Sequence, residues 1–184
     1  GWVHDLGAAW EAEQDRRRVI VSERDAGFVL ETVQPAPRDV VWRFMTDPAL
    51  RPSWQADVEV VDEQPTVPRR GVGTTNHCMH GEAVLVEEIL DWRPTEHVTH
   101  RTTLPNGLKL LSTFAYADDP AGTRVLVTAT WGRSRKERES MAGVREVVAG
   151  LVGRGQASLR VVLGDEMARR HLGGAPRAAA RGGT

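Results

Sequence analysis

The stretch EHVTHRTTLPNGLKLLSTFAYADDPAGTRVLVTATW, residues 96–131, contains three runs of strand-forming residues joined by two turns. Between the first two runs lies Pro105-Asn106-Gly107, and Asn-Gly is the strongest short signal for a β-hairpin. The runs at residues 96–103, 108–116 and 123–131 are joined by links too short for a crossover helix, so these strands must be antiparallel. The stretch therefore predicts an antiparallel meander.

Further strands are predicted on the N-terminal side of the meander. Residues 57–63, 72–80 and 83–92 are rich in strand-forming residues and are separated by turn-forming segments. Residues 28–33 alternate well enough for another strand, and residues 19–21 favour a short one before it. We therefore expect a sheet of about seven main strands.

Two short helices are predicted between residue 33 and the strand at residues 57–63. Pro37 suits the first helical position, and Asp39 suits the positive end of the helix dipole. Apolar residues at positions 40, 41, 44 and 45 follow at helical spacing. Asp47 is the predicted cap of a second helix, with Pro48 at its first position.

A long helix is predicted after the last strand, where the apolar period changes from two to about 3.6. Ser134 and Glu137 match a capping box, and apolar residues between 141 and 163 follow at spacings of three and four. We expect an interruption at residues 153–155, because glycine costs roughly 1 kcal/mol relative to alanine in a helix. Residues 173–184, rich in Gly, Ala and Arg, are predicted to form a flexible tail.

The first 18 residues are predicted to form an amphipathic helical arm ahead of a single domain at residues 19–172. Trp2, Leu6 and Trp10 recur every four residues and would share one face of the helix. We expect this face to pack on the domain or to contact a partner chain. That partner is either a second copy in a homodimer or the rest of a longer parent chain.

Composition argues against several classes of protein. The chain has 184 residues and a formal net charge of -1, and its basic residues are interleaved with acidic ones, so we expect no nucleic-acid partner. No apolar run approaches the roughly 20 residues that span a bilayer, so no membrane span is expected. The single cysteine excludes an internal disulfide and fits a reducing compartment, so the predicted location is the cytoplasm.

The segment APRDVVWRFMTDP at residues 36–48, Trp54 after it, and the Gly122-Thr123-Arg124 turn resemble the START-like (SRPBCC) superfamily. This superfamily includes polyketide cyclases and aromatases, lipid-transfer proteins and plant Bet v 1-like proteins. The resemblance implies an α+β helix-grip fold, in which a curved antiparallel sheet wraps around the long C-terminal helix and leaves an apolar cavity. Residues 76–81, followed by residues 91–94, are similar to a subgroup of bacterial members.

Residues 71–81, GVGTTNHCMHG, concentrate the unusual chemistry of the chain. In a regular strand Asn76, Cys78 and His80 would share one face, and the residues between them the other. Cys78 and His80 alone would supply only half of a tetrahedral zinc site, and we predict no metal and no other cofactor. Cys78 is either a nucleophile activated by a histidine or, as we expect for a free cysteine, a small buried hydrophobe.

Acid/base chemistry has its own set of candidates. If the hairpin of residues 57–80 turns midway, Asp57 lies across from His77, and a carboxylate beside an imidazole favours the protonated form of the imidazole. Such a pair either moves protons or only stabilises the hairpin. His80 and Tyr116 complete the predicted catalytic set.

Strand alternation and helical spacing predict a cavity wall built from the last strands and the long helix. The phase of residues 96–103 leaves open which of His97 and His100 points inward, and Glu87 and Glu88 should divide between the cavity and solvent. The residues predicted to contact a ligand are Trp54, Asn76, Cys78, Trp92, His100, Leu110, Phe114, Trp131, Val148, Leu151 and Val152.

These features predict a domain that binds a hydrophobic or aromatic small molecule, polyketide-like or lipid-like, in an internal cavity. If the protein is an enzyme, the resemblance implies cyclisation, aromatisation or dehydration of a bound polyketide, with proton transfer by the catalytic set. The alternative is a non-catalytic carrier, a sequestering resistance protein or a ligand-sensing domain of a larger chain, since one fold hosts many functions.

Overall fold

The computed structural model describes residues 13, 18–55, 58–64, 70–80 and 82–173, without the side chains of residues 60–62, 80 and 172–173. This part of the chain contains one seven-stranded sheet, antiparallel throughout, with the strand order β1-β7-β6-β5-β4-β3-β2. The strands are β1 (Phe28–Gln34), β2 (Val60–Gln64), β3 (Thr75–His80), β4 (Ala83–Arg93), β5 (His97–Thr103), β6 (Lys109–Asp119) and β7 (Gly122–Thr130). Consecutive strands from β2 to β7 are neighbours, which confirms the predicted meander, and β1 pairs with β7.

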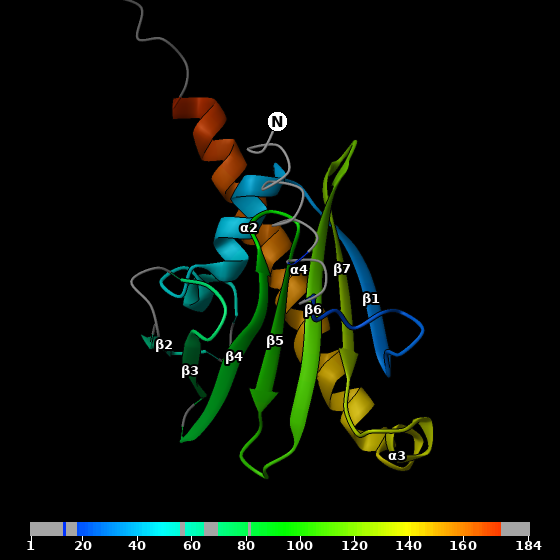
Figure 1. Cartoon of the computed structure of the whole chain (residues 1–184). Coiled ribbons are helices and arrows are strands. Elements are labelled where there is room, and N and C mark those ends of the chain that lie inside the picture. Colours follow the sequence, from blue (N-terminus) through cyan, green and yellow to red (C-terminus); the bar gives the residue numbers. More distant parts are fainter. Residues whose placement is uncertain (1–12, 14–17, 56–57, 65–69, 81, 174–184) are drawn as a thin grey trace, which may run out of the picture.

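The helical elements are α2 (Arg38–Thr46), the 3-10 turn η1 (Arg51–Ser53), α3 (Arg135–Ser140) and α4 (Ala142–Gly173). Figure 1 shows the curved sheet with α4 lying along its concave face and α2 beside α4. This arrangement confirms the predicted helix-grip fold. None of the helices that the structure describes is long and apolar enough to cross a membrane.

The predicted hairpin between β5 and β6 is confirmed in detail. The Gly107 amide donates to the Leu104 carbonyl at 2.8 Å, and the Leu108 amide donates to Asn106 Oδ1 at 3.0 Å. Gly107 has a φ of 80°, in the left-handed region where glycine carries no steric cost. The Pro-Asn-Gly sequence therefore fixes this turn through its local backbone preferences.

The helix ends follow the predicted chemistry with small shifts in position. Pro37 precedes α2 as its cap residue instead of occupying its first position. The Ala49 amide donates to Asp47 Oδ1 at 3.0 Å, as expected for a capping aspartate. The helical turn that follows, η1, begins at Arg51 and not at Pro48.

The capping box is confirmed, but the predicted interruption of the long helix is wrong. The Glu137 amide donates to Ser134 Oγ at 3.2 Å, and the Glu137 carboxylate accepts the Ser134 amide in return. The chain breaks between α3 and α4 at Met141, whereas α4 runs without a break across residues 153–155. Packing of α4 on the core outweighs the propensity cost of its glycines.

The two ends of the chain lie mostly outside the described residues. Of the predicted arm, residues 1–18, only Glu13 and Arg18 are described. The predicted tail begins at residue 173, which is the last residue of α4. Residues 174–184 are outside the described part of the chain.

Residues 18–22, here called the strap, are not the strand that the sequence predicted, yet they lie against the convex face of the sheet. Side chains from three strands bond to the backbone of the strap. The bonds run from Val19 N to Asp91 Oδ2 (2.9 Å), from Val21 N to Thr113 Oγ1 (2.9 Å) and from Thr128 Oγ1 to Val21 O (2.7 Å). In Figure 1 this dark blue segment crosses the sheet on the side opposite α4.

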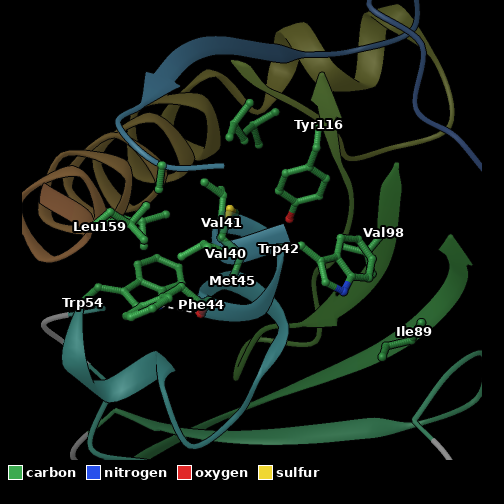
Figure 2. Packing of buried hydrophobic residues seen from close by; sticks show 14 residues of the cluster. Val40, Val41, Trp42, Phe44, Met45, Trp54, Ile89, Val98, Tyr116 and Leu159 are labelled. Carbon is green, nitrogen blue, oxygen red and sulfur yellow. Dashed lines mark hydrogen bonds between the residues drawn. The ribbon is translucent and has the colours of Figure 1, made fainter. Parts of the chain in front are cut away.

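The main core lies between the concave face of the sheet, α2 and α4. The Trp42 ring of α2 meets the rings of Trp92 and Tyr116 edge-on, with centroids 4.8 and 5.3 Å away. Figure 2 shows Trp42 on the side of α2 that faces the sheet, and Leu159 of α4 near Trp54. Aromatic pairs in this geometry contribute roughly 0.5–1.5 kcal/mol beyond area burial, so they fix α2 firmly on the sheet.

Candidate functional site

A cavity of about 160 Å³ lies between the concave face of the sheet, η1 and the middle of α4. Strands β4, β5 and β6 supply one wall, η1 and the residues after it a second, and α4 a third. The lining residues are Arg51, Trp54, Gln55, Leu85, Glu87, His100, Thr102, Leu104, Leu110, Ser112, Phe114, Val148, Leu151, Val152, Arg154, Gly155 and Gln156.

Most of the wall is apolar, and its residues follow from the two periodicities of the chain. Leu110 and Phe114 share the concave face of β6, where alternate residues point the same way. Val148, Leu151 and Val152 recur at helical spacing on α4 and face them. The structure thus places these five predicted ligand contacts, with Trp54 and His100, at the cavity wall.

Gly155 of α4 packs beside the Trp54 ring. A Cβ atom added to Gly155 would lie 3.4 Å from Cζ3 of the Trp54 ring, at ordinary van der Waals contact. The Trp54 indole is held from the other side, because its Nε1 donates to the Phe44 carbonyl at 2.9 Å. Any side chain longer than alanine at position 155 would meet this fixed ring or enter the cavity.

The polar end of the cavity is built around an ion pair between Arg51 and Glu87. The guanidinium bonds both carboxylate oxygens, and Nη2 lies 3.2 Å from Glu87 Oε1. Gln55 Oε1 accepts two further bonds from Arg51, at 3.1 and 2.9 Å. Burial alone would raise the pKa of Glu87, but the charge and hydrogen bonds of Arg51 outweigh burial and lower that pKa to about 2.

His100 is the imidazole that faces the cavity. Of the two histidines on β5, it is therefore His100 and not His97 that points inward. It is 8% exposed, and its ring meets Phe114 edge-on with centroids 6.0 Å apart. Burial lowers the pKa of His100 to about 4, against the opposing influence of Glu87. A neutral imidazole, which has one donor and one acceptor, therefore lines the wall.

We expect His100 to make the stability of the protein depend on pH. Its ordinary pKa of 6.5 is lowered to about 4 in the fold, so between these values the unfolded chain binds a proton that the folded chain does not. The free energy of unfolding then falls as the pH decreases through this window. By about pH 5 the loss for the wild type should exceed that for His100→Phe by on the order of 2 kcal/mol.

Urea unfolding at about pH 7 and about pH 5 measures this difference. The charged groups around His100 are Glu87, Arg51 and Arg70, and all three remain in the variant. Equal losses for the wild type and His100→Phe would contradict the assignment of a neutral, buried imidazole.

His97, the other histidine of β5, lies on the convex face. Its Nε2 is 3.1 Å from Asp91 Oδ2, and the same carboxylate oxygen accepts the Val19 amide of the strap.

The predicted division of Glu87 and Glu88 between the cavity and solvent is also confirmed, because Glu87 lines the cavity while Glu88 pairs with Arg101.

Cys78 and Asn76 are buried on β3 and are not among the residues that line the cavity. Burial, with the nearby charge of Glu87, raises the pKa of the Cys78 thiol to about 12. A thiol that stays protonated near neutral pH is a poor nucleophile, which agrees with the small buried hydrophobe. Asn76 Oδ1 accepts a bond from Arg70 at 3.2 Å.

Three other predicted site residues belong to the packing around the cavity. Trp92 and Tyr116 are part of the core around Trp42, and burial raises the pKa of the Tyr116 hydroxyl well above its ordinary value. Trp131 packs against Gly27 at the far end of the sheet, where an added Cβ would lie 3.0 Å from its ring. None of the three is among the residues that line the cavity.

The predicted pairing of Asp57 with His77 is wrong in register. Opposite His77 on β2 is Asp62, because the pairing is centred between residues 69 and 70 and not at residue 67 as the prediction assumed. Asp57 and the side chain of His80 lie outside the described residues. In the part of the chain that the structure describes, no group of three His, Cys, Asp or Glu residues is arranged to hold a metal.

Sequence reasoning missed several polar residues of the wall. Thr102 and Ser112 could have been found, because they alternate with His100 and Leu110 on their strands. Arg51 carried no signal, since the sequence separation of 36 between it and its partner Glu87 follows only from the tertiary fold.

Solved structures with the same fold share little sequence with this chain. A Thermobifida fusca protein aligns with a TM-score of 0.59 and 18% identity, covering 75% of this chain and 93% of that one. A Chromobacterium violaceum protein aligns with a TM-score of 0.58 and 16% identity, covering 74% and 95%. Ara h 8.0201 aligns with a TM-score of 0.56 and 13% identity, covering 74% and 95%.

No curated protein sequence matches the chain. The family model described as polyketide cyclase / dehydrase and lipid transport matches residues 26–164, which include every strand of the sheet and most of α4. The resemblance drawn from residues 36–48 and the Gly122 turn is thereby confirmed. The chain belongs to the polyketide cyclase / dehydrase and lipid transport family, within the START-like superfamily.

Proposed function

We propose that this protein binds a small, largely apolar molecule in the cavity between the sheet and α4. The observation that carries the proposal is the cavity itself, whose wall is mostly apolar and includes one neutral imidazole, His100. A ligand with one hydrogen-bonding group can bond this imidazole while its apolar body fills the cavity.

The volume of the cavity limits what it holds. At about 160 Å³ it is close to the roughly 150 Å³ of an apolar cavity that stays dry and accepts benzene. The bound part of the ligand is therefore one ring or a short alkyl chain. Membership of a family that includes lipid transport and polyketide chemistry supports a hydrophobic ligand of this kind.

Binding without catalysis is the form of this function that the site supports best. Of the predicted catalytic residues, His77 and Tyr116 are not among the lining residues. His100 is at the wall, but an imidazole with a pKa of about 4 is a weak base near neutral pH. Cyclisation, aromatisation or dehydration of a polyketide-like substrate stays the alternative, with His100 in place of the predicted set.

We expect the wild-type protein to bind ethylbenzene and the variant Ser112→Phe to lose that binding. Ser112 lines the cavity from β6, and an aromatic side chain there would occupy the space that the ligand needs. The matched control is Leu111→Phe, because Leu111 is on the same strand and is absent from the cavity wall. Titration calorimetry with each protein measures the affinity.

Two results would overturn the proposal. One is the absence of ethylbenzene binding by the folded wild type, and the other is equal loss of binding in both variants. Turnover of an aromatic polyketide mimic that His100→Phe abolishes, while ethylbenzene still binds, would favour the catalytic alternative.

A further inference from the structure

The cavity contains charged groups, yet its polar end presents no net charge to a ligand. Arg51 and Glu87 form a buried pair, and His100 beside them is neutral. We propose that the cavity selects uncharged ligands bearing one hydrogen-bonding group that both donates and accepts, and rejects carboxylates, with Glu87 as the residue that sets this selectivity. This inference rests on the proposed function and specifies the chemical class of its ligand.

Arg51 is not available to hold an anionic ligand. Its guanidinium makes two hydrogen bonds to Glu87 and two to Gln55, so four of its five N–H groups are used within the protein. The residue is 7% exposed. A ligand carboxylate would have to displace Glu87 from a bidentate pair, which is the strongest arrangement an arginine makes with a carboxylate.

Glu87 would also repel such a ligand directly. It keeps its negative charge at all ordinary pH values, because Arg51 lowers its pKa to about 2, and its side chain lines the cavity. Two carboxylates in one poorly solvated site are strongly unfavourable. The other arginine that lines the cavity, Arg154, is exposed. Its Nη1 lies near Gly150, where an added Cβ would be 3.1 Å away, and Gly150 is not part of the wall.

The groups that can bond a ligand are neutral. His100 and Ser112 are paired in register between β5 and β6, and both line the cavity beside Thr102. A neutral imidazole and two hydroxyls each donate and accept. A primary amide or a phenolic hydroxyl matches this set, because each also donates and accepts without bringing a charge into the wall.

The test compares two ligands of the same shape that differ in charge. Titration calorimetry at about pH 7.5 measures 4-methylbenzamide and 4-methylbenzoate with the wild type, and a carboxylate is fully ionised at this pH. We expect the amide to bind at least about tenfold more tightly. Equal affinities, or tighter binding of the carboxylate, would overturn the inference.

Variants then test the role of Glu87. In Glu87→Gln the charge of Arg51 is no longer neutralised, so we expect the preference to reverse toward 4-methylbenzoate. The matched control is Glu88→Gln, which changes the same residue type on the opposite face of β4. The control should keep the wild-type preference, and an unchanged preference in Glu87→Gln would remove Glu87 from the explanation.

A double variant tests the same argument without an unpaired buried charge, which could unfold Glu87→Gln. Arg51→Gln combined with Glu87→Gln removes both charges, so the amide should stay preferred. Preference for the carboxylate in the double variant would contradict the argument. Ethylbenzene binding distinguishes failure of the proposed function from failure of this inference. If the wild type does not bind ethylbenzene, the proposed function is overturned. If it binds ethylbenzene but shows no preference between the amide and the carboxylate, only this inference is overturned.

Discussion

Replacing Glu87 with alanine is expected to lower the free energy of unfolding by about 3–5 kcal/mol. The reason is not the lost attraction alone. Removing the carboxylate leaves the guanidinium of Arg51, 7% exposed, without a counter-charge in a poorly solvated site. Stranding a buried charge is much more costly than the net stability that a buried ion pair provides.

The adjacent residue supplies the control for this prediction. Glu88 also pairs with an arginine, but the side chains of Glu88 and Arg101 are 36% and 43% exposed. Water screens such pairs, so Glu88→Ala should cost at most about 1 kcal/mol. Urea unfolding of both variants measures the contrast, and similar losses for Glu87→Ala and Glu88→Ala would show that Arg51 is solvated well enough to lose its partner.

Alanine at position 122 is expected to destabilise the protein by at least about 3 kcal/mol, through the backbone and not through the core. Gly122 has a φ of 136°, which disfavours every residue with a Cβ. An added Cβ would also lie 2.1 Å from the Gln34 carbonyl oxygen and 2.9 Å from the Ala36 nitrogen. Both contacts are to backbone, so relief requires β1 and β7 to move apart.

The hairpin glycine at position 107 allows the two costs to be separated. Gly107 also has a positive φ, 80°, but an added Cβ there meets nothing within 4 Å. Gly107→Ala should therefore cost only the conformational strain, about 1–2 kcal/mol. Thermal unfolding of the two variants is the measurement, and equal losses would mean that the close approach at Gly122 contributes nothing.

Local signals made most of the fold predictable from the sequence. Pro105-Asn106-Gly107 determines its turn through backbone preferences, and Ser134 with Glu137 determines a helix start through reciprocal hydrogen bonds. Neither signal depends on distant residues. The strap shows where local signals fail. Its apolar residues predict a strand, whereas the side chains that bond its backbone are 72 to 107 positions away in the sequence.

The site was predictable to the extent that it follows from periodicity. Alternation on β6 and helical spacing on α4 placed Leu110, Phe114 and the valines of α4 at the wall. The register between β2 and β3 was wrong, since it depends on the length of a loop and a shift of one residue reverses a face. A β-bulge between Ile89 and Asp91 changes the phase within β4 in a way that alternation does not anticipate.

The strap also has a practical consequence for handling the protein. Because Val19 and Val21 are fixed to the convex face of the sheet, the strap itself lies on the side opposite the cavity. A fluorophore or surface tether attached at the strap would therefore be held on the face away from the ligand site. The same attachment at the end of α4 would act on the helix that forms one wall of the cavity, so immobilised binding measurements should use the N-terminal side.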